Sequence, residues 1–248
     1  MQLTRVLNVL GRNDFRLIGR DQFLTGLFGY VIAMALVLRF GFPWAEGMVA
    51  GNPDIDLDIV SFYPLLIGYM VFFSSGLIGG MIVGFLILDE RDQNTIKAML
   101  VTPLPVNYYM VYRVLIPMAL TFFIAIFMFL VINQALIPIW QLLLVAAVAS
   151  LNGPLIAMFV AAMAQNKVQG FGMLKIIGTS GLLIFVGWFI AEPLQFLVGI
   201  FPPYWAVKAY WTMLEGGAAW PIFLAMGVVL NVAAIWFLSR RVERMAYA

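Results

Sequence analysis

Histidine and cysteine are both absent from this chain of 248 residues, and only 10% of its residues are charged. The absence of cysteine excludes a disulfide framework and thiolate metal sites. The absence of histidine excludes zinc sites of the HExxH type and catalysis by Ser-His or Cys-His pairs. Since about a quarter of the residues of a soluble domain are charged, the composition also excludes a soluble enzyme.

Apolar residues dominate instead: 64% of the chain is hydrophobic, and its mean hydropathy is +1.00. A single domain of this size could not bury so much apolar surface and keep a wettable exterior. A membrane crossing takes about 20 residues, and the uncharged runs divide into six such segments. We therefore expect one all-α integral membrane domain over residues 1–248, with spans at 23–42, 60–88, 114–132, 140–165, 169–190 and 218–238.

The charges predict the orientation of these spans. With six spans both termini lie on one side, and that side then carries 12 of the 14 basic residues but only six of the 12 acidic ones. The two sides have net charges of +6 and −4, and the positive side faces the cytoplasm. The sequence therefore predicts a multi-pass protein of the cytoplasmic (inner) membrane with both termini in the cytoplasm.

Residues 1–21 are predicted to form an amphipathic helix in the cytoplasmic interface. At 100° per residue its arginines fall within an arc of about 80°, with leucines on the opposite side; Asp14 does not fit this division. The arginines would face anionic headgroups. Simple anchoring and a mechanical role are both compatible with the pattern, which rests on Arg5, Arg12, Arg16 and Arg20.

The connection between spans 2 and 3 has an unusual concentration of charge. Asp89 to Met99 has helical propensity and no proline or glycine, and Pro103 and Pro105 then end it. A short charged helix is expected here, although a solvated loop that only sets the topology is the alternative. Its charged residues are Asp89, Glu90, Arg91, Asp92 and Lys97.

This connection resembles that of the permeases of the ABC-2 type transporter family. The resemblance rests on an acidic-Arg pair after a long second span, then a Thr and a Thr-Pro-Leu, and on the order of elements along nearly the whole chain. Loop style and length are similar to permeases that export drugs of the fluoroquinolone type. The matching residues are Glu90, Arg91, Thr95, Thr102-Pro103-Leu104, Tyr109 and Arg113.

The resemblance implies that the charged helix is a coupling helix that docks on a separate ABC ATPase subunit. The chain has no GxxxxGK loop of its own, so ATP and Mg²⁺ would be bound by that partner and this chain would hold no cofactor. Glu90 and Arg91 would either pair with the ATPase or hold the coupling helix in register. The coupling residues implied are Asp89, Glu90, Arg91, Thr95 and Pro103.

Two patterns inside the spans concern helix packing. Gly76, Gly80 and Gly84 form one face of span 2, where small residues let another helix approach closely. That helix could belong to the same subunit or to a second permease copy or paralogue in a dimer. In span 4, Asn152-Gly153-Pro154 predicts a kink.

The segment between spans 5 and 6 is too short to cross the membrane and too apolar for a free loop. It resembles the short re-entrant external helices of the ABC-2 family, and a tryptophan-rich interfacial anchor is the alternative. Its marker residues are Glu192, Pro202, Pro203 and Trp205.

These observations favour the permease subunit of an ATP-driven exporter, which is not itself an enzyme. Because no span carries an unambiguous central charge, a hydrophobic or amphipathic cargo fits better than an ion. An ATP-independent channel or secondary carrier is the alternative, and a lipid-modifying membrane enzyme is a third hypothesis. Membrane lipids are expected partners, and nucleic acid is not.

Overall fold

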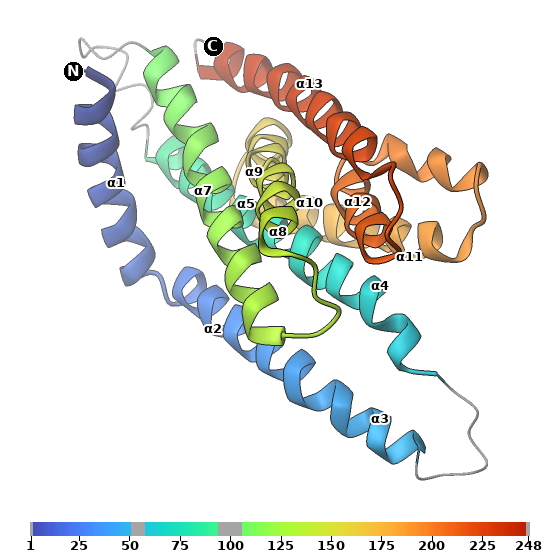
Figure 1. The fold of residues 1–248 in the computed structure, drawn as a ribbon. Helices are drawn as coiled ribbons and strands as arrows, with labels where there is room; N and C mark the ends of the chain where they lie inside the picture. Colours follow the sequence, from blue (N-terminus) through green and yellow to red (C-terminus); the bar gives the residue numbers. More distant parts are fainter. Residues whose placement is uncertain (1, 51–57, 94–105, 247–248) are drawn as a thin grey trace.

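The computed structural model describes residues 2–50, 58–93 and 106–246, and every regular element in these ranges is a helix (Figure 1). Six helical segments are long and apolar enough to cross a membrane, in agreement with the six predicted spans, so the chain is a multi-pass membrane protein. They are Gln22–Ala50, Val60–Asp92, Tyr108–Ile132, Ile139–Met163, Lys167–Phe189 and Trp220–Glu243.

The N-terminal helix and the first span meet at a single residue, Asp21. Helix α1 (Gln2–Arg20) ends there, and the Asp21 carboxylate accepts the backbone N–H groups of the next turn at 2.9 and 3.2 Å, which caps the start of α2 (Gln22–Leu36). The span continues through a π-helical turn, η1 (Val37–Gly41), into α3 (Phe42–Ala50).

The second span is the most deeply buried of the six. It begins with η2 (Val60–Phe62) and α4 (Tyr63–Ile67), passes through a second π-helical segment, η3 (Gly68–Phe73), and ends with α5 (Ser74–Asp92). Helix α5 packs mainly against α7 and α9, so its apolar residues form the centre of the hydrophobic core.

Spans three to five surround this helix. Span three is the continuous helix α7 (Val106–Ile132); span four is divided into α8 (Ile139–Ala149) and α9 (Asn152–Met163). Span five consists of α10 (Lys167–Ser180) and α11 (Leu182–Phe189). The division of span four falls at the predicted kink.

Two short helices precede the last span, α13 (Trp220–Ala246). They are the 3₁₀ helix η4 (Leu194–Ile200) and α12 (Tyr204–Leu214). Every residue of α12 before Leu214 is buried, so this helix is inserted into the bundle and packs against α8, α13 and η3.

Several helices extend beyond the predicted span ends. At the first and third spans the extension contains polar or charged residues, which the prediction excludes from the span. The first span extends to Ala50 rather than residue 42, and α7 begins at Val106 rather than residue 114. A span defined by its uncharged residues stops before Arg113, whereas the helix continues because that arginine has partners inside the bundle.

The beginning of α1 and the end of α13 lie at the same end of the bundle (Figure 1). We call this the terminal end, and the opposite one the distal end. Helix α5 also ends, and α7 also begins, at the terminal end (Figure 1). The residues with which the site below is built all lie there.

Candidate functional site: a buried charge network

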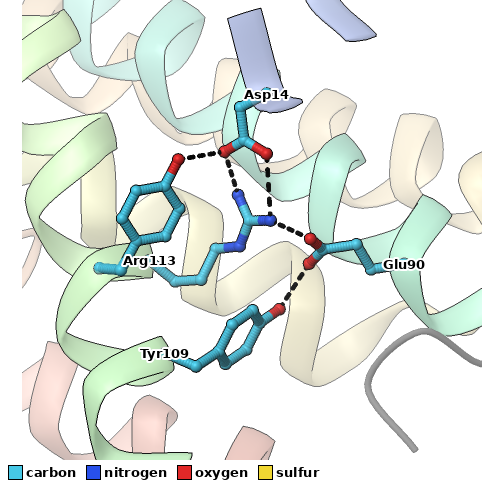
Figure 2. A network of polar contacts seen from close by, with 5 residues as sticks. Asp14, Glu90, Tyr109 and Arg113 are labelled. Atoms are coloured by element: carbon cyan, nitrogen blue, oxygen red, sulfur yellow. Dashed lines mark hydrogen bonds and ion pairs between the residues drawn. The ribbon is translucent and has the colours of Figure 1, made fainter. Parts of the chain in front are cut away.

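Arg113, on the second turn of α7, is completely buried, which is rare for arginine. Figure 2 shows its guanidinium between Asp14 of α1 and Glu90 of α5. Its Nη1 lies 2.7 Å from Asp14 Oδ2, and its Nη2 lies 3.4 Å from Asp14 Oδ1 and also contacts the Glu90 carboxylate. One side chain therefore joins three helices at the terminal end.

Two tyrosines on the same face of α7 complete the network. Tyr109 donates its hydroxyl to Glu90 Oε2 at 2.6 Å, and Tyr112 donates to Asp14 Oδ2 at 2.7 Å. Both rings flank the guanidinium, with centroids 5.3 and 5.2 Å from Arg113 Cζ. Each carboxylate thus receives one charged and one neutral donor, which holds both side chains in fixed positions.

The network buries two carboxylates against one guanidinium. Removing one member of a buried ion pair costs about 3–5 kcal/mol because the remaining charge loses its partner. Arg113 is therefore the member on which the others depend most, since both Asp14 and Glu90 are paired with it.

Arg91, beside Glu90 on α5, bonds to the end of α9. Its Nη1 and Nη2 donate to the backbone carbonyls of Ala164 and Ala161, each at 2.8 Å. The last carbonyls of a helix have no partner within the helix and carry its negative partial charge. Arg91 therefore caps α9 and fixes it to α5.

Lys167, the first residue of α10, forms a third, more exposed link. Its Nζ lies 2.9 Å from Asp89 and 3.4 Å from Asp21. Partial burial by itself raises the pKa of Asp21, but the backbone N–H groups of Leu24 and Phe23 and the Lys167 ammonium together lower it below its ordinary value. Asp21 therefore stays ionised and keeps α1, α2 and α10 in contact.

The predicted coupling residues are partly brought together here. Asp89, Glu90 and Arg91 form the last turn of α5 and are bonded within the chain, whereas Thr95 and Pro103 lie outside the described residues. The expected charged helix over Asp89 to Met99 is described only at its beginning, where α5 continues without a break from the apolar span to Asp92; residues 94–105 lie outside the described residues. The long apolar helix simply extends one more turn because its charges are satisfied by neighbouring helices.

Sequence reasoning did not assign a role to Asp14, nor to Arg113 beyond its place in the motif. The available signal was the position of Asp14 on the apolar side of the N-terminal helix, where a carboxylate needs a buried partner. Arg12, Arg16 and Arg20 on the opposite side are exposed, so among residues 10–20 of α1, whose burial is described, the charge that breaks the amphipathic pattern is the one that enters the bundle.

The glycine face of α5 is directed at α9 of the same chain. A Cβ atom at Gly76 would lie 2.5 Å from Asn152 Cβ, one at Gly80 would lie 2.6 Å from Ile156 Cβ, and one at Gly84 would lie 3.2 Å from Val160 Cβ. These glycines allow α5 and α9 to approach closely. The face is used within one subunit and is not available to a second one.

The segment between spans five and six is held together by its own polar contacts. Glu192 pairs with Lys208 at 2.7 Å, and Trp205 donates its indole N–H to the Gly199 carbonyl at 2.8 Å. Pro202 is half-buried and Pro203 is buried at the start of α12. The segment is therefore a fixed structure of two short helices at the ends of spans five and six.

The arrangement as a whole binds helices to one another. Within residues 2–50, 58–93 and 106–246, no three His, Cys, Asp or Glu side chains are grouped so that they could hold a metal ion. The carboxylates of the network are already engaged by Arg113 and the tyrosines. Its chemistry is therefore positional: it fixes the helices from which the α5–α7 connection leaves and to which it returns.

Comparison with known proteins gives a consistent result. Residues 14–239 match the family model described as "Fluoroquinolones export permease protein Rv2686c-like". The chain is 32% identical over 249 residues to the fluoroquinolones export permease proteins Rv2686c and MT2760 of two Mycobacterium tuberculosis strains, covering 96% of this chain and 94% of each relative. No solved structure matches. The matched region includes the entire charge network.

Proposed function

Because the chain belongs to the Rv2686c-like family of fluoroquinolone export permeases, a family of the ABC-2 type, we propose that it is the membrane subunit of an exporter driven by a separate ABC ATPase. ATP and Mg²⁺ are bound by that partner. The permease works as a dimer with a second copy or a paralogue, and one ATPase docks beneath each permease. ATP binding in the paired ATPases then moves the two bundles between inward-open and outward-open states.

The observation that carries this proposal is the burial of Arg113 between Asp14 and Glu90. A push on the α5–α7 connection can move the spans only if both ends of the connection are firmly attached to the bundle. Glu90 and Arg91 attach its first end to α7 and α9, and Arg113 attaches its second end to α1 and α5. Force applied to the connection is thus delivered to four helices together: α1, α5, α7 and α9.

This assigns different roles to the coupling residues. Glu90 and Arg91 hold the connection in register, because both are engaged within the chain. Contact with the ATPase is assigned to residues further along the connection, including Thr95 and Pro103. Asp89 contributes through its pair with Lys167.

The terminal end is assigned to the cytoplasm, with α1 in the membrane interface and η4 and α12 at the external side. The charge difference between the two sides supports this orientation. So does the row of exposed arginines on α1, which suits anionic headgroups.

The proposed cargo is an amphipathic aromatic compound of the fluoroquinolone class, as named for the relatives. A cavity of about 470 Å³ lies between α9, α10, α13 and the turn before α12, within the usual size range of drug sites. Its lining is almost wholly apolar and includes Phe159, Phe201 and Phe237. Such walls suit an apolar ring system and offer no site for an ion.

The test is ATP-driven export in a defined system. The tagged chain, co-purified with its P-loop partner and reconstituted in liposomes, is expected to move a fluorescent fluoroquinolone only when ATP is present on the ATPase side. Glu90→Gln should uncouple ATP hydrolysis from transport, whereas Asp92→Asn, which alters an exposed neighbour, should leave coupling intact. Equal transport without ATP or without the partner would favour the channel or carrier instead.

A further inference from the structure

Spans two and four lose regular α-helical structure at the same level of the bundle. In span two, the π-helical η3 changes to α5 at Ser74, and in span four α8 ends at Ala149 and α9 begins at Asn152. The Asn152 side chain joins these two discontinuities, because its Nδ2 donates to the backbone carbonyl of Phe72 at 3.1 Å. One amide therefore connects the irregular parts of both helices.

On the terminal side of this level, the helices form one tightly connected body. The glycine face of α5 lets its backbone approach α9 closely, and Gly170 of α10 lies against Phe85 of α5. Arg91, Arg113 and Lys167 then tie α1, α5, α7, α9 and α10 together. We call this set the terminal body.

On the distal side, a different set of contacts forms a second body around α12. Tyr210 lies with its ring 5.0 Å from that of Phe72 and donates its hydroxyl to the Ala135 carbonyl at 2.8 Å. Trp211 donates its indole N–H to the Pro64 carbonyl at 3.0 Å. These contacts, together with the packing of α8 against α12, join η3, α4, α8 and the α7–α8 connection to α12, and we call the set the distal body.

Between the two bodies lies a group of buried oxygen atoms that have no hydrogen-bond partner among the described residues. They are Ser75 Oγ, Thr121 Oγ1 and Asn152 Oδ1, and all three residues are fully buried. Native structures rarely leave such atoms unpaired, because each lost bond is costly. Three of the buried side-chain atoms without a partner therefore gather at this joint, where a different arrangement of the two bodies would give them partners.

Spans two, three and four also have weakened helical backbones at this joint. Pro117 removes one hydrogen bond from α7 and lies beside Gly79 and Gly153, and Pro154, in the first turn of α9, has no N–H with which to bond back to α8. Proline and π-helical segments are the usual places where long helices bend. Spans two, three and four therefore each have a place at this joint at which they can bend.

We propose that Asn152 is a positioning residue of the transport cycle: it links spans two and four at a hinge about which the distal body tilts against the terminal body. The role of the hinge in transport rests on the proposed function. The tilt itself is a property of this chain and can be measured without transport. The amide keeps the two spans bending together, and the unpaired oxygens mark the surface that repacks.

The tilt can be measured by spin labelling, because the chain contains no cysteine and introduced ones are labelled alone. Val168→Cys with Ile139→Cys places labels on exposed positions of the two bodies, and Val168→Cys with Val111→Cys keeps both on the terminal body. In lipid nanodiscs the first pair is expected to give two distance populations, and the second pair one. A single narrow distance for the first pair would overturn the hinge.

The role of Asn152 is tested by Asn152→Leu against Asn231→Leu. Asn231 is the matched control: it is equally buried and also has an unpaired Oδ1, but its Nδ2 bonds only within α13, to Gly227. Asn152→Leu should change the ratio of the two populations, and Asn231→Leu should not. The same change in both variants, or in neither, would overturn the role of Asn152.

Two further measurements separate the possible failures. If Asn152→Leu does not fold, Asn152→Ala removes the same bond with a smaller side chain, and thermal unfolding verifies that each variant is intact. If the label distances show two populations but the protein carries out no ATP-driven transport, the hinge is supported and the proposed function is contradicted. Coupled transport at the wild-type rate in Asn152→Ala, with unchanged distances, would contradict the hinge alone.

Discussion

Arg113 and Asp14 are 99 positions apart in the chain, yet their side chains form a buried ion pair at 2.7 Å. The pair attaches the N-terminal helix to the third span, and the same guanidinium attaches both to the second span through Glu90. Because each carboxylate also accepts a tyrosine hydroxyl, the attachment is directional as well as charged. The N-terminal helix is therefore part of the bundle.

Loss of Arg113 should be more damaging than loss of Asp14. Arg113→Met leaves two buried carboxylates without a cation and should cost about 3–5 kcal/mol of stability. Asp14→Asn keeps a one-to-one pair between Arg113 and Glu90 and should cost less. Thermal unfolding in detergent checks the order, with Arg12→Gln, an exposed residue of the same helix, as the control; equal losses for all three would contradict it.

Removal of the Arg91 cap should loosen the end of α9. Arg91→Gln removes the cation from the last carbonyls of α9, an interaction worth up to about 2 kcal/mol where it is partly buried. Hydrogen exchange should become faster in the last turn of α9 and stay unchanged in α13. Asp92→Asn, one position further on α5, should have no such effect, and exchange that rises equally in both variants would argue against the cap.

The glycines of α5 should tolerate substitution by alanine better where an added Cβ lies farther from its neighbours. At Gly80 a Cβ would lie 2.7 Å from the Gly153 carbonyl oxygen, which cannot move without the backbone, whereas at Gly84 it would meet Val160 at 3.2 Å. Gly80→Ala should cost about 1–3 kcal/mol by overpacking, and Gly84→Ala less. Gly26→Ala, with nothing within 4 Å, should be neutral or stabilising because alanine favours a helix. Unfolding midpoints rank the three variants.

The Asp21 charge should contribute to stability at every pH above its ordinary pKa of 3.8. Its pKa is lowered in the folded chain from an ordinary value of 3.8. The contribution is therefore present above 3.8 and is lost as the pH falls through the lowered value. Asp21→Asn keeps the cap on α2, since asparagine caps as well as aspartate, and removes only the charge. Its unfolding midpoint should lie below the wild-type midpoint near neutral pH and meet it in acid; a constant difference would contradict this account.

The spans could be predicted from the sequence because hydropathy over 20 residues is a local property. The kink at Asn152-Gly153-Pro154 was predictable for the same reason, since Pro154 acts on its own helix. The partner of Asn152 was not, because Phe72 offers only a backbone carbonyl, which every residue has. The sequence also could not show whether the charges near Glu90 contact other helices of this chain or a partner subunit. That depends on which helices pack beside α5.

Asp14 is the instructive case. Its position on the apolar side of α1 indicated that it needed a partner, but several arginines were available as candidates. Only the packing of α7 beside α1 selects Arg113. Long-range pairing of this kind depends on the order of helices in the bundle, which a single sequence with six apolar runs leaves open.

The ion pair between Asp14 and Arg113 also sets an order of events during synthesis. Asp14 leaves the ribosome 99 residues before Arg113, so for that interval its carboxylate has no cation to accompany it into an apolar environment and has to remain in water. Helix α1 can therefore dock only after the third span has been inserted. Helix α1 thus leaves the ribosome before the second and third spans, yet reaches its final place only after both have been made.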